Sequence, residues 1–178
     1  MVILHARDRM ATPWKNGAGI TRDVACDPPG ATMATFRWRI SLAEIQANVP
    51  FSQFLGIERT LTVVDGRGMT LTATSGETTE APRDVPISFP GESAVVCQLY
   101  DGPVVAFNVM TRRGVAAASV EILAAPARIR HGARVVLVMA LRDALVVAGR
   151  QLSPWDAIVL DGDAELAGVG TAAVVRIE

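Results

Sequence analysis

The residues 13–21 combine groups that a small-molecule site would use. The aromatic ring of Trp14, the cation of Lys15 and the amide of Asn16 precede a turn with two glycines, and the hydroxyl of Thr21 follows it. An aromatic surface beside a few fixed polar groups is a common composition of a ligand pocket. Each residue alone could equally serve a surface or a turn, so the interpretation depends on the set.

Further polar groups occupy predicted strands that are otherwise apolar. Arg39 and Ser41 share one face of the first of these strands, and Asn108 and Met110 share one face of a later one. Arg59 begins a third apolar stretch. Arginine forms strong, often bidentate hydrogen bonds with carboxylates. An interior that holds these arginines and an amide would therefore suit an anionic ligand.

A metal centre is not expected, because the chain has only two histidines. His5 and His131 lie far apart, and neither belongs to a His-x-His motif that would suit a transition metal. Cys26 and Cys97 show no metal-binding spacing, and free thiols are the expected state. There is no phosphate-binding glycine loop, nucleophile elbow or Cys/His pair. We expect no metal, no other cofactor and no catalytic residue of these types.

Composition narrows the choice of partners. Half of the chain is apolar, and 17 basic residues nearly balance 18 acidic ones, so no net charge favours nucleic acid or an anionic membrane. Charges from Arg7 onward interrupt any signal-peptide core, and no apolar run approaches the roughly 20 residues of a membrane helix. These features predict a soluble cytoplasmic protein whose partner is a small anionic metabolite.

The dominant hydrophobic period is two, which predicts strands rather than helices. The expected strands are 36–42, 60–64, 69–74, 85–89, 93–99, 104–110, 120–123, 134–140, 144–148, 157–160 and 172–177. Residues 41–47 could instead form a helical turn. Many short strands separated by turn signals are typical of an all-β sandwich or barrel.

A faint internal repeat suggests two similar halves. Residues 59–73 form a strand, a tight turn and a second strand, and lead to Phe89-Pro90-Gly91-Glu92. Residues 134–148 repeat this pattern and lead to Leu160-Asp161-Gly162-Asp163. We therefore predict one domain over 1–124 and a second over 125–178, with the boundary near Pro126.

Four blocks in this order resemble the HutD/Ves family: residues 14–21 (WKNGAGIT), 36–41 (FRWRIS), 50–59 (PFSQFLGIER) and 107–114 (FNVMTRRG). The resemblance implies a bicupin, with two cupin-like (RmlC-like) antiparallel barrels in tandem. It also implies a role in bacterial histidine utilisation through binding of formylglutamate or urocanate, without a demonstrated reaction. The expected ligand-binding residues are Trp14, Lys15, Asn16, Thr21, Arg39, Ser41, Phe54, Arg59, Asn108 and Met110.

The two ligands would use these residues differently. Formylglutamate, a dicarboxylate, could pair with Arg39, Arg59 and Lys15, whereas urocanate would need one cation and could stack on Trp14 or Phe54. An alternative is a metal-independent cupin isomerase or epimerase that acts on a small carboxylate or sugar. Its acid and base would have to come from Glu44, Glu58 and Tyr100. A third alternative is a module that forms a homodimer through sheet edges.

Overall fold

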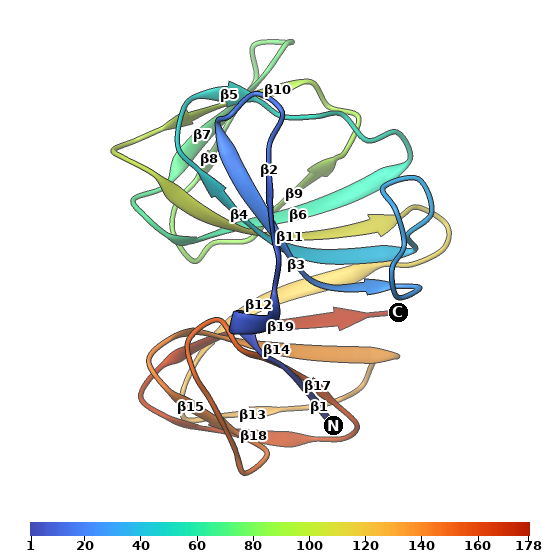
Figure 1. Ribbon diagram of the computed structural model, residues 1–178, viewed down its shortest axis with the longest axis vertical. Coiled ribbons are helices and arrows are strands. Elements are labelled where there is room, and N and C mark those ends of the chain that lie inside the picture. Colours follow the sequence, from blue (N-terminus) through green and yellow to red (C-terminus); the bar gives the residue numbers. More distant parts are fainter. The chain divides into compact units, whose positions relative to one another are not determined.

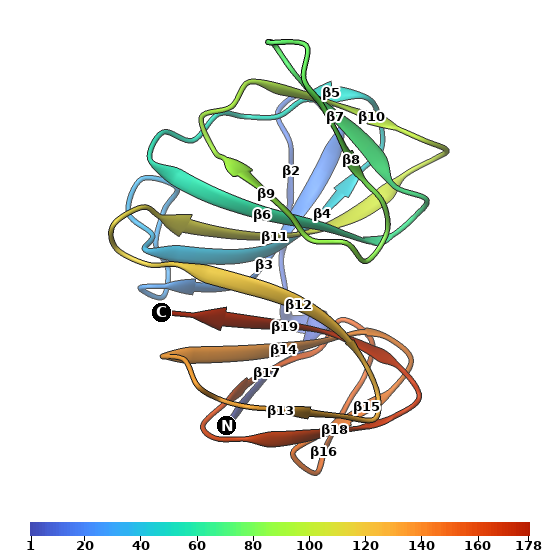
Figure 2. The same cartoon turned by 180° about the vertical axis from the view of Figure 1, so that it is seen from behind.

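The computed structural model describes residues 1–178, and its regular secondary structure is almost entirely β (Figures 1 and 2). The only helical element is one short 3-10 turn, η1 (Ala6–Asp8). No helix is both long and apolar enough to cross a membrane. The chain divides into two compact units. We name Met10–Ala117 the first unit, and Met1–Arg9 together with Ala118–Glu178 the second unit.

The first unit contains two antiparallel sheets, with the strand orders β2-β3-β4-β11-β6-β9 and β5-β10-β7-β8. The strands are β2 (Ala11–Pro13), β3 (Gly19–Asp27), β4 (Trp38–Ile45), β5 (Val49–Pro50), β6 (Ile57–Asp65), β7 (Met69–Ala73), β8 (Thr78–Ala81), β9 (Ile87–Pro90), β10 (Val95–Leu99) and β11 (Val104–Arg112). Side chains of both sheets form one apolar core, which includes Ala43, Leu61, Leu71 and Cys97.

The second unit also contains two antiparallel sheets, with the orders β1-β17-β14-β19-β12 and β13-β18-β15-β16. The strands are β1 (Val2–Leu4), β12 (Ala118–Ala124), β13 (Ala127–Ile129), β14 (Val135–Arg142), β15 (Leu145–Val147), β16 (Arg150–Leu152), β17 (Ala157–Leu160), β18 (Ala164–Gly168) and β19 (Thr171–Ile177). Its core likewise draws on both sheets, with Val136, Val174, Leu145 and Leu166 among its members.

The two units repeat the same topology. Strands β4 to β11 give the orders β4-β11-β6-β9 and β5-β10-β7-β8, and strands β12 to β19 give β12-β19-β14-β17 and β13-β18-β15-β16. The eight strands thus correspond in sequence order, with β2 and β3 added to one unit and β1 to the other. The faint repeat in the sequence therefore corresponds to a repeated strand arrangement.

The observed division differs from the expected boundary at 124/125. The units separate between β11 and β12, and the expected boundary falls where β12 gives way to β13 inside the second unit. The N-terminal residues also belong to the second unit, because Val2–Leu4 pairs with β17. Local sequence patterns do not reveal that these residues belong to the second unit, because the pairing joins opposite ends of the chain.

The helical turn that the sequence allows at 41–47 does not form. Ser41 to Ile45 continue β4, which is hydrogen-bonded to β3 on one side and to β11 on the other. Alternation along β4 places Arg39, Ser41, Ala43 and Ile45 on one face, and Ala43 and Ile45 belong to the core. The pairing on both sides outweighs the local helical preference of this segment.

Candidate functional site

The interior of the first unit holds a buried guanidinium, that of Arg59. Only 7% of this residue is exposed. It lies on β6, opposite Phe89 of β9 on one side and Met110 of β11 on the other. Its Nη2 donates a hydrogen bond to Oδ1 of Asn108 at 3.1 Å, whereas its buried Nε has no hydrogen-bond partner. A buried donor without an acceptor is costly to the fold and therefore suggests a ligand.

Three phenyl rings surround this cation. The guanidinium carbon lies 5.2 Å from the ring centre of Phe51, 5.6 Å from that of Phe54 and 5.0 Å from that of Phe89. We name Phe51, Phe54 and Phe89 the aromatic cage. The ring faces attract a cation, but they accept no strong hydrogen bonds from it. The cage therefore holds the charge in place and leaves the Nε–H of Arg59 without an acceptor.

Arg59 also keeps its charge without a carboxylate partner. Burial lowers its pKa to about 10, which still leaves it protonated at neutral pH. None of the ion pairs in the structure involves it. The interior around Arg59 thus carries a net positive charge that an anion could neutralise.

Arg39 is nearby in the sheet but is already neutralised. It lies opposite Met110 on β11, the residue that also pairs with Arg59. Its Nη2 forms a close ion pair with Asp23 of β3. Of the two interior arginines that the sequence points to, the structure leaves only Arg59 without an acidic partner.

Four of the other expected site residues also gather here. Asn108 stands opposite Ser41 on β4, and both are buried. Met110 packs with Phe36 and Ile57 in a small apolar cluster that Phe54 also contacts. The alternation of strand residues thus brings Ser41, Phe54, Asn108 and Met110 to the region of Arg59.

The other expected site residues lie elsewhere, in the hairpin formed by β2 and β3. There, Nε1 of Trp14 donates to Oγ1 of Thr21 at 2.7 Å, and the side chain of Asn16 accepts from the backbone N–H of Ala18 at 3.1 Å. Lys15 is exposed at the tip. These polar groups are thus largely used within the hairpin itself.

The strand ladder places the tip of this hairpin away from Arg59. Gly19 pairs with Ile45, at the opposite end of β4 from Arg39. That length of strand spans about 20 Å at roughly 3.3 Å per residue. A side chain at Gly19 would place its Cβ 2.5 Å from the backbone oxygen of Glu44, so the glycine is required by close packing. The motif therefore specifies the hairpin, and Trp14 packs against the same apolar core as Phe51 and Phe89 of the cage.

The loop that carries Phe51 and Phe54 is held by Gly91, which is not among the expected site residues. Gly91 donates its N–H to the oxygen of Ile57 at 2.7 Å and accepts the N–H of Phe54 at 2.8 Å. A Cβ at this position would lie 2.7 Å from the backbone oxygen of Phe54. Only glycine allows this approach, which fixes one wall of the cage.

An exposed ionic cluster supports the same loop from outside. Arg113 forms a close ion pair with Glu92, lies 3.7 Å from Glu58 and donates to the backbone oxygen of Ile57 at 3.3 Å. The hydrogen bond from Arg113 lowers the pKa of Glu92. The conspicuous Arg112-Arg113 pair in the sequence is structural, because Arg112 also donates to the oxygens of Phe36 and Ala34.

The acid–base candidates for an isomerase are not arranged around Arg59. Glu44 is paired with Arg22, and Glu58 with Arg113. Tyr100 is 46% exposed and contacts the turn at Gly68. The geometry therefore gives these three residues no common site at the buried cation.

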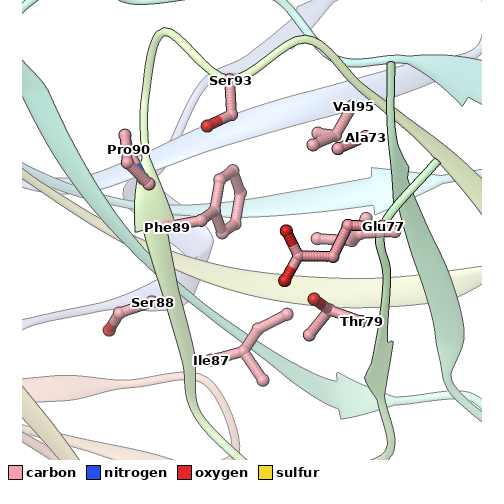
Figure 3. A pocket seen from close by; sticks show the side chains of 10 residues that line it. Ala73, Glu77, Thr79, Ile87, Ser88, Phe89, Pro90, Ser93 and Val95 are labelled. Carbon is pink, nitrogen blue, oxygen red and sulfur yellow. The ribbon is translucent and has the colours of Figure 1, made fainter. Parts of the chain in front are cut away.

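A pocket of about 230 Å³ opens beside the cage in the first unit (Figure 3). Its wall comes from β7, β8, β9 and β10, and includes Leu71, Thr79, Val95 and Phe89. Phe89 belongs to both features, since its ring contacts Arg59 and also lines the pocket. Neither Phe51 nor Phe89 was among the expected site residues, although residues 50–59 and the repeat at Phe89 drew attention to both segments.

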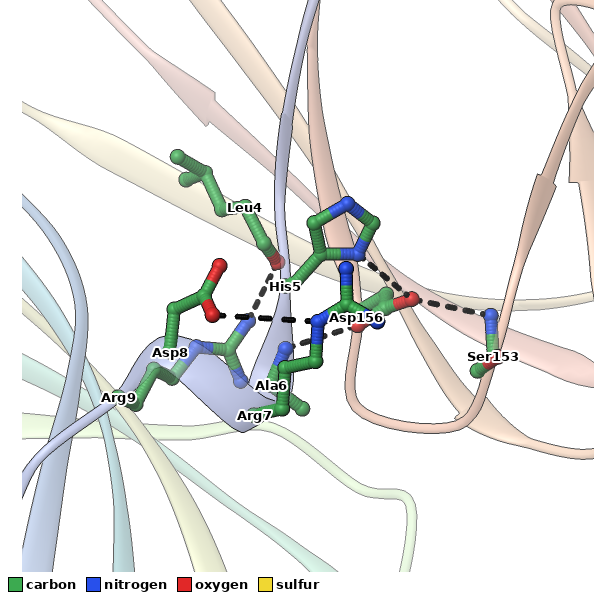
Figure 4. Close-up of polar contacts among 8 residues, drawn as sticks. All are labelled: Leu4, His5, Ala6, Arg7, Asp8, Arg9, Ser153 and Asp156. Atoms are coloured by element: carbon green, nitrogen blue, oxygen red, sulfur yellow. Dashed lines mark hydrogen bonds and ion pairs between the residues drawn. The ribbon is translucent and has the colours of Figure 1, made fainter.

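Both histidines have structural contacts in the second unit. Nδ1 of His5 lies 3.4 Å from the carboxylate of Asp156, which also accepts the N–H groups of Ala6 and Ser153 (Figure 4). His131 approaches the backbone oxygen of Leu160 through Nε2, at 3.2 Å. No group of three or more His, Cys, Asp or Glu side chains is arranged to hold a metal ion.

Solved structures define the class of fold. A cupin 2 conserved barrel domain protein from Leptotrichia buccalis aligns with a TM-score of 0.57 at 10% identity, and the alignment covers 93% of this chain and 91% of that one. HutD from Pseudomonas fluorescens SBW25 aligns with a TM-score of 0.89 at 31% identity, covering 99% of this chain and 97% of that one. The fold is therefore an all-β, cupin-like one.

The HutD family model matches residues 6–175, and the chain belongs to this family. A protein from the hutC 3′ region of Pseudomonas putida is 34% identical over 174 residues, which are 94% of this chain and 90% of that protein. Protein Ves of Citrobacter koseri is 38% identical over 110 residues, covering 61% of this chain and 56% of Ves. The resemblance found in the sequence is confirmed.

Proposed function

We propose that the chain is a cytoplasmic bicupin that binds a small anionic intermediate of histidine degradation and thereby modulates this pathway. In this proposal, each unit corresponds to one cupin-like barrel, and the ligand lies in the first. The observation that carries it is Arg59: a buried cation with no acidic partner, an unused Nε and a cage of three phenyl rings. Membership of the HutD family supports the link to histidine utilisation.

A carboxylate would complete the interactions of Arg59. Charge-assisted hydrogen bonds between guanidinium and carboxylate are roughly twice as strong as neutral ones, and the low-polarity cage strengthens them further. Because Arg39 is paired with Asp23, one unpaired cation is available for the ligand. This favours a monocarboxylate with a flat body, such as urocanate, over the dicarboxylate formylglutamate. The flat body could lie against the phenyl rings.

Titration calorimetry with urocanate and formylglutamate tests the proposal. Arg59→Met keeps most of the side-chain volume and removes the charge, and Arg150→Met is the control because Arg150 is exposed on β16. Losing a desolvated Arg–carboxylate contact costs about 2–5 kcal/mol, which corresponds to an affinity loss of roughly 30-fold or more. An exposed charge contributes only about 0–1 kcal/mol.

We expect Arg59→Met to weaken binding strongly and Arg150→Met to leave it nearly unchanged. Arg39→Met should have an intermediate effect, since it acts on the ligand only through the local balance of charge with Asp23. Binding of neither compound by the parent protein would remove the basis for this ligand class. Equal affinities of the Arg59→Met and Arg150→Met variants would exclude Arg59 as the anion-binding group.

A further inference from the structure

The pocket beside the cage has the opposite electrostatic character to Arg59. Its only charged side chain is that of Glu77, and the carboxylate points into the pocket toward the ring of Phe89 (Figure 3). The hydroxyl of Thr79 lies next to it, and Ser93 adds another hydroxyl to the wall. The side chain of Glu77 forms no hydrogen bond or ion pair within the chain. This wall offers a free acceptor, which suits a group that carries N–H.

The unpaired carboxylate of Glu77 and the incompletely bonded guanidinium of Arg59 have one common neighbour, the ring of Phe89. Phe89 lies opposite Arg59 in the ladder between β6 and β9, and its ring centre is 5.0 Å from the guanidinium carbon. The same ring forms a wall of the pocket that Glu77 faces. Opposite charges that share one apolar neighbour suit a short molecule with two different polar ends.

We propose that the pocket binds the nitrogen-bearing end of the ligand whose carboxylate is bound by Arg59. The ligand class is then a short, flat carboxylate with an N–H donor at its far end, such as an imidazole or an amine. Glu77 accepts the N–H, Phe89 contacts the body between the two ends, and Arg59 binds the carboxylate. This inference rests on the proposed function and adds to it the chemical identity of the second end.

Two compounds of matched shape distinguish the binding contributions of the two ends of the ligand. Urocanate is an imidazolyl acrylate and trans-cinnamate is the corresponding phenyl acrylate, so they share the carboxylate and differ in the N–H. The informative variant is Glu77→Met. Glu80→Met is its control, because Glu80 is also exposed and lies three residues further along, on β8, but does not line the pocket. Both positions are exposed, so neither change should disturb folding.

We expect the parent protein to bind urocanate about tenfold more tightly than cinnamate, since a hydrogen bond to a charged acceptor contributes on this scale. Glu77→Met should remove this preference by weakening urocanate binding and leaving cinnamate binding unchanged, and Glu80→Met should alter neither. Arg59→Met should weaken both compounds together.

The possible failures are distinguishable. Equal binding of the two compounds by the parent protein, or a Glu77→Met variant that keeps the preference for urocanate, overturns the role of Glu77 and leaves that of Arg59 intact. Unchanged binding of both compounds by Arg59→Met overturns the proposed function itself. Binding of neither compound by the parent protein overturns both proposals.

Discussion

The two units use the same strand order and fill it with different residues. In the first unit, Arg59 on β6 pairs with Phe89 on β9; in the second, Val136 on β14 pairs with Leu160 on β17. Phe89 and Leu160 each stand two residues before the glycine of the sequence repeat. Arg59 and Val136 are therefore equivalent positions, and both face the interior of their own unit.

This difference extends to the neighbouring strand. Asn108 on β11 pairs with Leu61, two residues along β6 from Arg59, and Val174 on β19 pairs with Val138, two residues along β14 from Val136. An amide that accepts from Arg59 thus corresponds to a valine in the apolar core. The second unit is optimised for packing, whereas the first places an incompletely bonded charge at the same point of the framework. Such a charge is unfavourable for stability and is expected where function requires it.

The largest expected effect comes from placing the charge in the wrong unit. Val136→Arg buries a cation among apolar side chains with no amide acceptor and no aromatic cage. We expect a loss of about 3–5 kcal/mol in the free energy of unfolding, the scale of an uncompensated buried charge. Urea denaturation measures it. Val146→Arg is the control, because Val146 is 38% exposed on β15 and its replacement should change the free energy of unfolding little. Equal stability of the two variants would contradict the comparison.

The reverse change should stabilise the first unit. Arg59→Met replaces an incompletely bonded cation with an apolar side chain of similar length, and we expect the free energy of unfolding to rise by about 1 kcal/mol. Arg112→Met is the matched control. Arg112 also stacks on a phenyl ring, at 5.6 Å from Phe36, but donates to two backbone oxygens. Its loss should destabilise by about 1–3 kcal/mol.

The sign of the Arg59→Met effect separates the two interpretations of this residue. A stability loss as large as that of Arg112→Met would mean that Arg59 stabilises the fold. A gain in stability together with a loss of ligand affinity would mean that it serves binding.

The sequence predicts much of this framework. Period-two alternation identifies most of the long strands and places Arg39 with Ser41, and Asn108 with Met110, on shared faces. The repeat at Phe89 and Leu160 corresponds to equivalent strands. The short strands β2, β13 and β16 carry too few residues for alternation to be visible, and the place of β1 depends on pairing with a segment more than 150 residues away.

The site is less predictable, because it depends on which charges are paired. Arg39 and Arg59 look alike in the sequence, and only the neighbouring strand shows that Asp23 neutralises the first. Phe51 and Phe89 read as ordinary core residues until the fold places them around one cation. For the hairpin residues Trp14 and Asn16, the sequence cannot separate a pocket rim from a turn, because turns and binding sites use the same residue types.

The second unit has one buried charged residue, Asp156, and its environment is the opposite of that of Arg59. Burial is the largest single influence on its pKa and opposes ionisation. The N–H groups of Ala6 and Ser153, together with His5, outweigh it and hold the pKa below the ordinary value (Figure 4). Because Ala6 follows β1, these contacts fasten the N-terminal segment to the body of the second unit.

The smallest expected effect concerns the fully hydrogen-bonded carboxylate of Asp156. A carboxylate with a lowered folded-state pKa stabilises the fold above its unfolded-state pKa of about 4, and this contribution is lost as the pH falls through the folded-state value. Asp156→Asn keeps one acceptor oxygen and loses the other, so it should lower the free energy of unfolding by about 1 kcal/mol near neutral pH. The difference from the parent protein should persist at about pH 6 and shrink at about pH 3, as urea denaturation would measure. Asp161→Asn is the control, because Asp161 is exposed and bonded only to the terminal amine. If Asp156→Asn lowers the free energy of unfolding equally at both pH values, the loss comes from poorer packing of the amide. In that case the charge of Asp156 does not hold the N-terminal segment in place.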